Sequence, residues 1–307
     1  MNEHIISHFP TGVITASLTP MDRYLNADFA LLVNHCQSLL RLGSDGIVLL
    51  GSTGEANSFS IDERKAILEA TLHGGIAAEA LMVGTGCCAI TDTIELTTHA
   101  VKLGVHNVLM LPPFYYKPLS DDVLFSYYAR VIERTGDDDL RIYLYHIPKN
   151  TGIELSRNLI SRLLKYYPHI VTGIKDSGGD WIHMQALMKE FPSFRLYSGT
   201  EEYLLETLKA GGAGCISATA NITVSVASSV TRAYRNGEYA DDQQKLLIAL
   251  RNVFSGFPFV GALKGFLAVE SSNPSWNYLR PPNASLDAEV VSTLKEKFNQ
   301  LLSPAVF

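Results

Sequence analysis

The chain has 307 residues, of which 47% are hydrophobic and 18% are charged, and this is enough apolar material for one large core in a single long domain. Its formal net charge of −6 and the lack of a basic run argue against nucleic acid or an anionic membrane as a partner. Because the sequence also has no apolar stretch of membrane-span length, no signal-peptide pattern and no zinc-type cysteine spacing, we expect a cytoplasmic protein.

Strand-like and helix-like segments alternate along the chain with a period of roughly thirty residues. Helical patterns such as 60–75, 91–104 and 120–136 lie between short β-branched runs, and several begin at Ser or Asp and end at Gly, as capped helices do. The predicted strands are 12–18, 46–50, 81–86, 107–111, 141–147, 170–176, 194–199 and 214–220.

This alternation predicts a parallel sheet covered by helices. Eight strand–helix units favour a closed (β/α)8 TIM barrel over an open sheet, and the turn after the first strand carries no Gly-rich dinucleotide loop. We expect residues 1–223 to form the barrel with the catalytic region. Residues 224–307 would then supply the last barrel helix and a C-terminal helical cap, with helical patterns at 243–254, 260–270 and 286–302.

The C-terminal strand ends of such a barrel are where active sites lie. Lys175, which ends the run IVTGIK, is the most informative residue there. Burial at a strand end would favour its neutral amine, which is the form that attacks a ketone. The same lysine could instead extend to the rim or pair with Asp176, and the residues alone leave these alternatives open.

Two tyrosines and a hydroxyl pair end other strands on the same rim. Tyr145 and Tyr116 carry phenols that can relay protons, although a tyrosine in a strand is more often part of the core. Ser52 and Thr53, flanked by glycines, could bind a carboxylate through backbone N–H groups or form a plain turn. His146 follows Tyr145 directly, so we expect it to face the opposite side, behind the barrel.

Four ordered motifs together resemble the dihydrodipicolinate synthase and N-acetylneuraminate lyase family of class I aldolases. The similarity runs from about Gly12 to Asn221, and the helical tail is also similar. The motifs are GSTGE at 51–55, PPFYYKP at 112–118, YHIP at 145–148 and GIKDSGGD at 173–180.

The resemblance implies a barrel in which Lys175 forms an imine with pyruvate or another 2-oxo acid and Tyr145 relays protons. It implies that Ser52 and Thr53 hold the pyruvate carboxylate, with Thr53 joining the relay. Tyr116 would reach a neighbouring site across a dimer interface, in a homo-oligomer that is usually a tetramer. No metal or redox cofactor belongs to this chemistry, because the protonated imine itself accepts the electrons of the broken C3–C4 bond.

The residues expected at the distal end of the substrate separate the members of the family. Asn150 stands where the synthase has an arginine that clamps the distal carboxylate of aspartate semialdehyde, and an amide cannot replace a bidentate guanidinium. The serine of the sialic-acid lyases falls on Ala218, while Gly199 and Glu202 partly match the preceding loop. Glu201 and Glu202 would repel anions and accept hydrogen bonds from hydroxyls, although acids also favour helix N-termini.

These features favour aldol cleavage or dehydration of an unphosphorylated 2-oxo-3-deoxy sugar acid. The first alternative is condensation of pyruvate with aspartate semialdehyde, the 4-hydroxy-tetrahydrodipicolinate synthase reaction, with Lys149 as the distal cation. A catalytically silent sensor of 2-oxo acids is a second alternative, which the nucleophile Lys175 disfavours. Ser177 and Ser217 are further candidate substrate contacts at strand ends.

Overall fold

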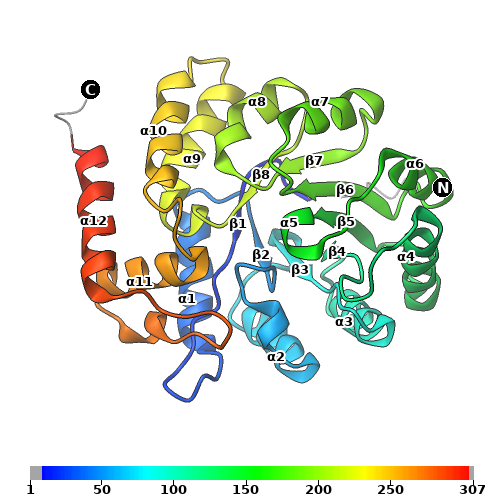
Figure 1. Cartoon of the computed structure of the whole chain (residues 1–307), viewed down its shortest axis with the longest axis horizontal. Coiled ribbons are helices and arrows are strands. Elements are labelled where there is room, and N and C mark those ends of the chain that lie inside the picture. Colours follow the sequence, from blue (N-terminus) through cyan, green and yellow to red (C-terminus); the bar gives the residue numbers. More distant parts are fainter. Residues whose placement is uncertain (1–8, 304–307) are drawn as a thin grey trace.

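Eight short parallel strands form the centre of the fold in this computed structural model, which describes residues 9–303 (Figure 1). Each strand pairs with the next one along the chain, and β8 pairs with β1, so the sheet closes into a barrel. The predicted (β/α)8 fold is confirmed. The strands are β1 (Gly12–Ala16), β2 (Gly46–Leu49), β3 (Leu81–Gly84), β4 (Asn107–Met110), β5 (Arg141–His146), β6 (Val171–Asp176), β7 (Arg195–Ser198) and β8 (Gly214–Ser217).

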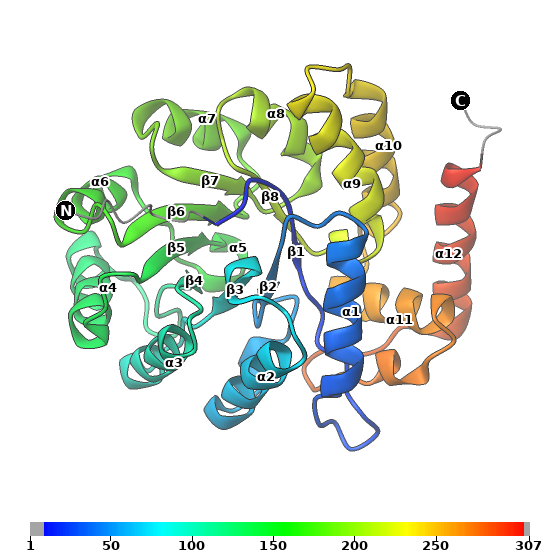
Figure 2. The same ribbon diagram turned by 180° about the vertical axis from the view of Figure 1, so that it is seen from behind.

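Helices follow the strands and surround the barrel (Figures 1 and 2). A short helix, α5 (Pro148–Thr151), and the 3-10 turn η3 (Glu201–Tyr203) lie at the C-terminal strand ends. None of the helices within residues 9–303 is long and apolar enough to cross a membrane. The outer helices are α1 (Phe29–Arg41), α2 (Ile61–His73), α3 (Ile90–Lys102), α4 (Asp121–Thr135), α6 (Arg157–Tyr166), α7 (Trp181–Glu190), α8 (Leu204–Lys209) and α9 (Ala220–Arg235).

Helix ends follow the capping signals of the sequence. Ser60 accepts a hydrogen bond from the Glu63 backbone N–H, and the Glu63 carboxylate accepts one from the Ser60 N–H, which makes a complete capping box for α2. The Ser120 side chain caps α4 by accepting a hydrogen bond from the Val123 backbone N–H, and Gly136 ends that helix in the left-handed conformation at φ 62°. These local bonds fix where each helix starts and therefore how it lies on its strand.

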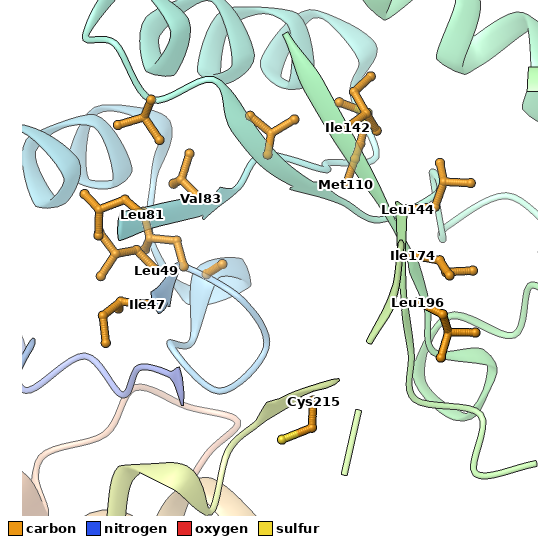
Figure 3. Close-up of a cluster of buried hydrophobic side chains, with 14 of the residues drawn as sticks. Ile47, Leu49, Leu81, Val83, Met110, Ile142, Leu144, Ile174, Leu196 and Cys215 are labelled. Atoms are coloured by element: carbon orange, nitrogen blue, oxygen red, sulfur yellow. The ribbon is translucent and has the colours of Figure 1, made fainter. Parts of the chain in front are cut away.

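Strand side chains alternate between two apolar layers. One layer fills the barrel interior and includes Ile14, Tyr143 and Tyr197. The other points outward against the helices, and Figure 3 shows its members on several strands, from Ile47 on β2 to Leu196 on β7. Above this apolar layer, inward-facing polar residues such as Lys175 lie at the C-terminal end of the barrel.

The C-terminal cap packs on one side of the barrel, next to α1 and α9 (Figures 1 and 2). It consists of α10 (Asp241–Asn252), α11 (Phe259–Glu270), η4 (Pro274–Asn277) and α12 (Ala288–Leu302). Phe254, Phe266 and Phe298 join these elements edge to face, with ring centroids 4.9–6.0 Å apart. The cap therefore has a small aromatic core of its own.

The first and last strands end earlier than predicted, at Ala16 and Ser217 instead of 18 and 220. The Asn221 amide takes the hydrogen bonds that a longer strand would use, donating to Ala16 O at 2.7 Å and accepting from Leu18 N at 3.1 Å. Since α9 begins at Ala220, the boundary expected after residue 223 lies inside this helix.

Candidate active site

Lys175 and Tyr145 lie opposite each other on neighbouring strands, at the C-terminal end of the barrel. They are register partners between β5 and β6, and both side chains point inward with only 4% of their surface exposed. The Lys175 ammonium lies 4.5 Å from the centroid of the Tyr145 ring. Within residues 9–303 Lys175 takes part in no ion pair, because Asp176 points to the other face of the strand, toward His183. Lys175 thus places a buried amine at the strand ends without a counter-ion among the described residues.

Two opposing effects act on the Tyr145 phenol. Burial alone would raise its pKa, but the positive charge of Lys175 and nearby hydrogen-bonding groups outweigh burial and lower the pKa below its ordinary value. These groups include the hydroxyls of Ser52 and Ser177. A phenol with a lowered pKa gives up its proton more readily near neutral pH, which suits it to a proton relay.

The loop that follows β2 brings Ser52 and Thr53 to the same site. Gly54 allows its tight turn, since a Cβ there would lie 3.0 Å from Ser17 O and 3.1 Å from Leu50 N. Thr19 holds the loop from the β1 side by donating to Gly54 O at 2.9 Å. The loop is therefore packed against the barrel rim rather than projecting into solvent.

A cavity of about 570 Å³ opens above Lys175 and reaches the C-terminal cap. A second cavity, of about 280 Å³, adjoins it and shares Ser52, Ile147, Asn150 and Asn283 in its wall. The combined space suits a small polar substrate. The predicted residues that line the larger cavity are Ser52, Thr53, Tyr145, Asn150, Lys175, Ser177, Gly199 and Glu202, together with Lys149.

Glu201 and Ser217 do not line this cavity, contrary to expectation. Glu201 is fully buried behind the strand ends, where its carboxylate accepts hydrogen bonds from Thr223, at 2.6 Å, and from Thr219. Burial raises its pKa, although these hydrogen bonds act in the opposite direction. Ser217 follows the inward Ile216 on β8, so alternation turns it outward to Thr219, with the two hydroxyl oxygens 3.0 Å apart. Both residues support the rim.

Tyr116 lies on the loop after β4, away from the cavity lining, and is 77% exposed. Its ring meets that of Tyr115, itself 72% exposed, edge to face at 5.1 Å. A single chain thus leaves two large aromatic side chains open to water, and the role expected for Tyr116 in a neighbouring site stays a prediction.

Four cavity residues from the C-terminal region were missed by the sequence analysis: Arg251, Phe259, Val260 and Asn283. The Arg251 guanidinium stacks 5.1 Å from the Phe259 ring centroid and donates to Thr219 Oγ1 at 3.1 Å. In the described chain it forms no ion pair. The sequence places Arg251 in an amphipathic helix but has no local signal that this helix reaches the barrel mouth.

One cluster on the outer side of the strand ends has metal-ligand chemistry. His146, Asp176 and His183 bring ligand atoms within 4.8 Å of one another. However, His146 Nδ1 accepts a hydrogen bond from Leu155 N, which leaves the ring proton on Nε2, the nitrogen that would have to coordinate. Burial lowers the pKa of His146 and raises that of Asp176. Because Tyr145 points into the barrel, the next residue on β5, His146, faces the outer side, as predicted.

The fold and this cavity define a (β/α)8-barrel protein with a buried lysine at the end of its sixth strand. Residues 9–301 match the model of the dihydrodipicolinate synthetase family. The chain therefore belongs to this family.

Individual relatives span most of the chain. An uncharacterized DapA-like lyase of Chloroflexus aurantiacus is 33% identical over 96% of this chain and 98% of its own. The 4-hydroxy-tetrahydrodipicolinate synthase of Bacillus subtilis is 31% identical over 79% and 83%. YagE of Escherichia coli, a prophage protein of this family solved in complex with pyruvate, superposes with a TM-score of 0.86 at 28% identity, covering 95% of this chain and 98% of that one.

Proposed function

We propose that this protein is a class I lyase that forms a Schiff base between Lys175 and pyruvate or another 2-oxo acid. The observation that carries the proposal is the Lys175 ammonium, buried at the floor of the cavity without a carboxylate partner in residues 9–303 and 4.5 Å from the Tyr145 ring. The likeness to YagE, whose structure contains pyruvate, supports the choice of ligand.

In the proposed reaction the neutral Lys175 amine adds to the C2 carbonyl, and the resulting carbinolamine takes up a proton from solvent and loses water to give the protonated imine. Ser52 and Thr53 hold the substrate carboxylate at the rim. Tyr145, as its phenolate, takes the proton of the C4 hydroxyl, and the C3–C4 bond breaks so that an aldehyde leaves. The electron pair of that bond forms the C2=C3 double bond of an enamine, with the protonated imine as the electron acceptor. Protonation at C3 and hydrolysis then release pyruvate and restore the lysine.

The distal wall supports a hydroxylated substrate, namely a 2-oxo-3-deoxy sugar acid. Glu202 supplies an acceptor there, while Asn150, Asn283 and Arg251 supply donors. A chain of hydroxyls uses donors and acceptors together, whereas Glu202 would repel a second anionic group. The E. coli relative YagE, provisionally named a 2-dehydro-3-deoxy-D-gluconate aldolase, is consistent with this class.

One observation favours a second candidate, condensation of pyruvate with aspartate semialdehyde. Arg251 and Lys149 both line the cavity, and either cation could bind a distal carboxylate in place of the guanidinium that Asn150 lacks. The Bacillus subtilis relative carries that synthase name. In either reaction we propose a homo-oligomer, with Tyr116 completing the site of a neighbouring subunit.

Borohydride reduction in the presence of pyruvate tests the Schiff base. Intact mass should show one reduced pyruvate per chain, and Lys175→Ala should abolish the adduct. Lys149→Ala is the matched control, because Lys149 lines the same cavity but should leave labelling intact. Labelling that persists in Lys175→Ala would reject the assignment. A protein that traps pyruvate but turns over no aldehyde or sugar acid would instead be a sensor.

A further inference from the structure

A buried ion pair joins the C-terminal cap to the loop that carries Ser52 and Thr53. The Lys264 ammonium on α11 donates to Glu55 Oε1 at 2.7 Å, and neither side chain has exposed surface. Lys264 also donates to the backbone carbonyl of Tyr278 at 2.8 Å. The proposed reaction uses neither charge, so the pair calls for a different explanation.

The second carboxylate oxygen of Glu55 is bound by the cap as well. Glu55 Oε2 accepts from Asn283 Nδ2 at 3.2 Å and from the Arg280 backbone N–H at 3.4 Å. Glu55 itself sits in the left-handed region at φ 56°, a conformation that a residue with a Cβ adopts only when its surroundings hold it there. The cap thus binds both carboxylate oxygens of a residue whose backbone is in a constrained conformation.

Glu55 lies two residues after Thr53, and its backbone N–H closes the loop by donating to Ser52 O at 3.2 Å. Displacement of Glu55 would therefore move the carbonyl of Ser52 and the turn that presents both hydroxyl residues to the cavity. Burial of two charges costs so much desolvation that an apolar pair of similar volume can be equally stable. Stability alone therefore does not account for this pair, and its place beside Ser52 and Thr53 links it to the carboxylate-binding loop.

We infer that Lys264 is a positioning residue for the carboxylate-binding loop, acting through Glu55. The inference rests on the proposed function, since it assumes that Ser52 and Thr53 bind the carboxylate of the 2-oxo acid. Removal of the ammonium leaves a buried carboxylate without its partner. Glu55 then turns toward water and takes the loop with it. Pyruvate binding should weaken even though Lys264 does not line the cavity.

The test measures borohydride trapping of pyruvate as a function of its concentration. In Lys264→Met the half-saturating pyruvate concentration should rise by about tenfold or more, the usual effect of losing a charge-assisted contact. The double variant Glu55→Gln/Lys264→Met buries no unpaired charge and should recover most of that loss. Phe266→Leu, which loosens the aromatic core of the cap without touching the loop, should lower the melting temperature and leave the half-saturating concentration unchanged.

An unchanged half-saturating concentration in folded Lys264→Met would overturn the inference, as would a double variant no better than the single one. If Lys264→Met does not fold, the same measurement on Glu55→Gln tests the inference. This substitution keeps the size of the side chain, so a pure packing role predicts no change in the half-saturating pyruvate concentration. A positioning role predicts that this concentration rises. Failure of the wild type to trap pyruvate at all would reject the proposed function instead, so the two failures are distinct.

Discussion

Replacement of Tyr145 by Phe should separate imine formation from carbon–carbon cleavage. Phe keeps the ring that lies 4.5 Å from the Lys175 ammonium, so the amine should still react with pyruvate. Only the hydroxyl is lost, and with it the group proposed to take the C4 proton. A positioned acid–base group contributes about 10²–10⁴-fold in rate, so kcat should fall at least about a hundredfold, which corresponds to about 2.7 kcal/mol.

The assay follows pyruvate release under saturating sugar acid, alongside borohydride trapping of the same samples. Tyr143→Phe is the matched control, because Tyr143 also points into the barrel from β5 but lies deeper, in the apolar layer. Its turnover should stay close to that of the wild type. Near-normal turnover in Tyr145→Phe would show that a different group carries the proton, and loss of trapping would show that the phenol is needed before the imine forms.

Three further predictions address charge and assembly. Lys175→Met should raise the pKa of Tyr145, since burial then acts without the opposing positive charge. The phenolate absorbance of Tyr145, isolated by subtracting the signal of Lys175→Met/Tyr145→Phe, should appear at higher pH than in the wild type. A titration at the same pH as in the wild type would contradict this prediction. Mixed oligomers of Lys175→Ala and Tyr116→Phe should regain part of the activity, and no recovery in demonstrably mixed species would indicate a site built from one chain. The wild type should prefer glyceraldehyde to aspartate semialdehyde as the partner of pyruvate. Asn150→Arg should shift the ratio of the two kcat/KM values toward the semialdehyde by about ten- to a hundredfold. A wild type that already prefers the semialdehyde would indicate that Arg251 binds the distal carboxylate.

Local patterns were sufficient to predict the barrel and the centre of the site. β-Branched runs and capped helices indicate the order of the elements, and that order places Lys175 and Tyr145 at one end of a closed sheet. The error at Ser217 came from treating every polar residue near a strand end as facing the cavity. Side chains alternate between the two faces along Gly214–Ser217, so Ser217 faces outward. This orientation could have been predicted from the sequence.

The contribution of the C-terminal cap could not be predicted in the same way. Lys264 and Glu55 are separated by 209 positions, and Asn283 and Glu55 by 228. No periodicity or cap signal connects segments so far apart, and a lysine in an apolar helix normally extends toward water. Contacts of this kind depend on how α11 and the segment after it pack on the barrel, which only the assembled fold specifies.

The alignment of Lys175 with Tyr145 depends on an irregularity between β5 and β6. Ile142 pairs with Val171, whereas Tyr143 pairs with Gly173, so Thr172 is an extra residue in β6. Without it, Tyr145 would face Ile174, and the two strands would present their side chains out of phase. Gly173 accommodates the bulge, since a Cβ there would lie 2.5 Å from Arg195 O and 2.6 Å from the Tyr143 ring. One additional residue in the sixth strand thus brings the Lys175 amine opposite Tyr145 at the cavity, while the carboxylate of the neighbouring Asp176 lies next to His183.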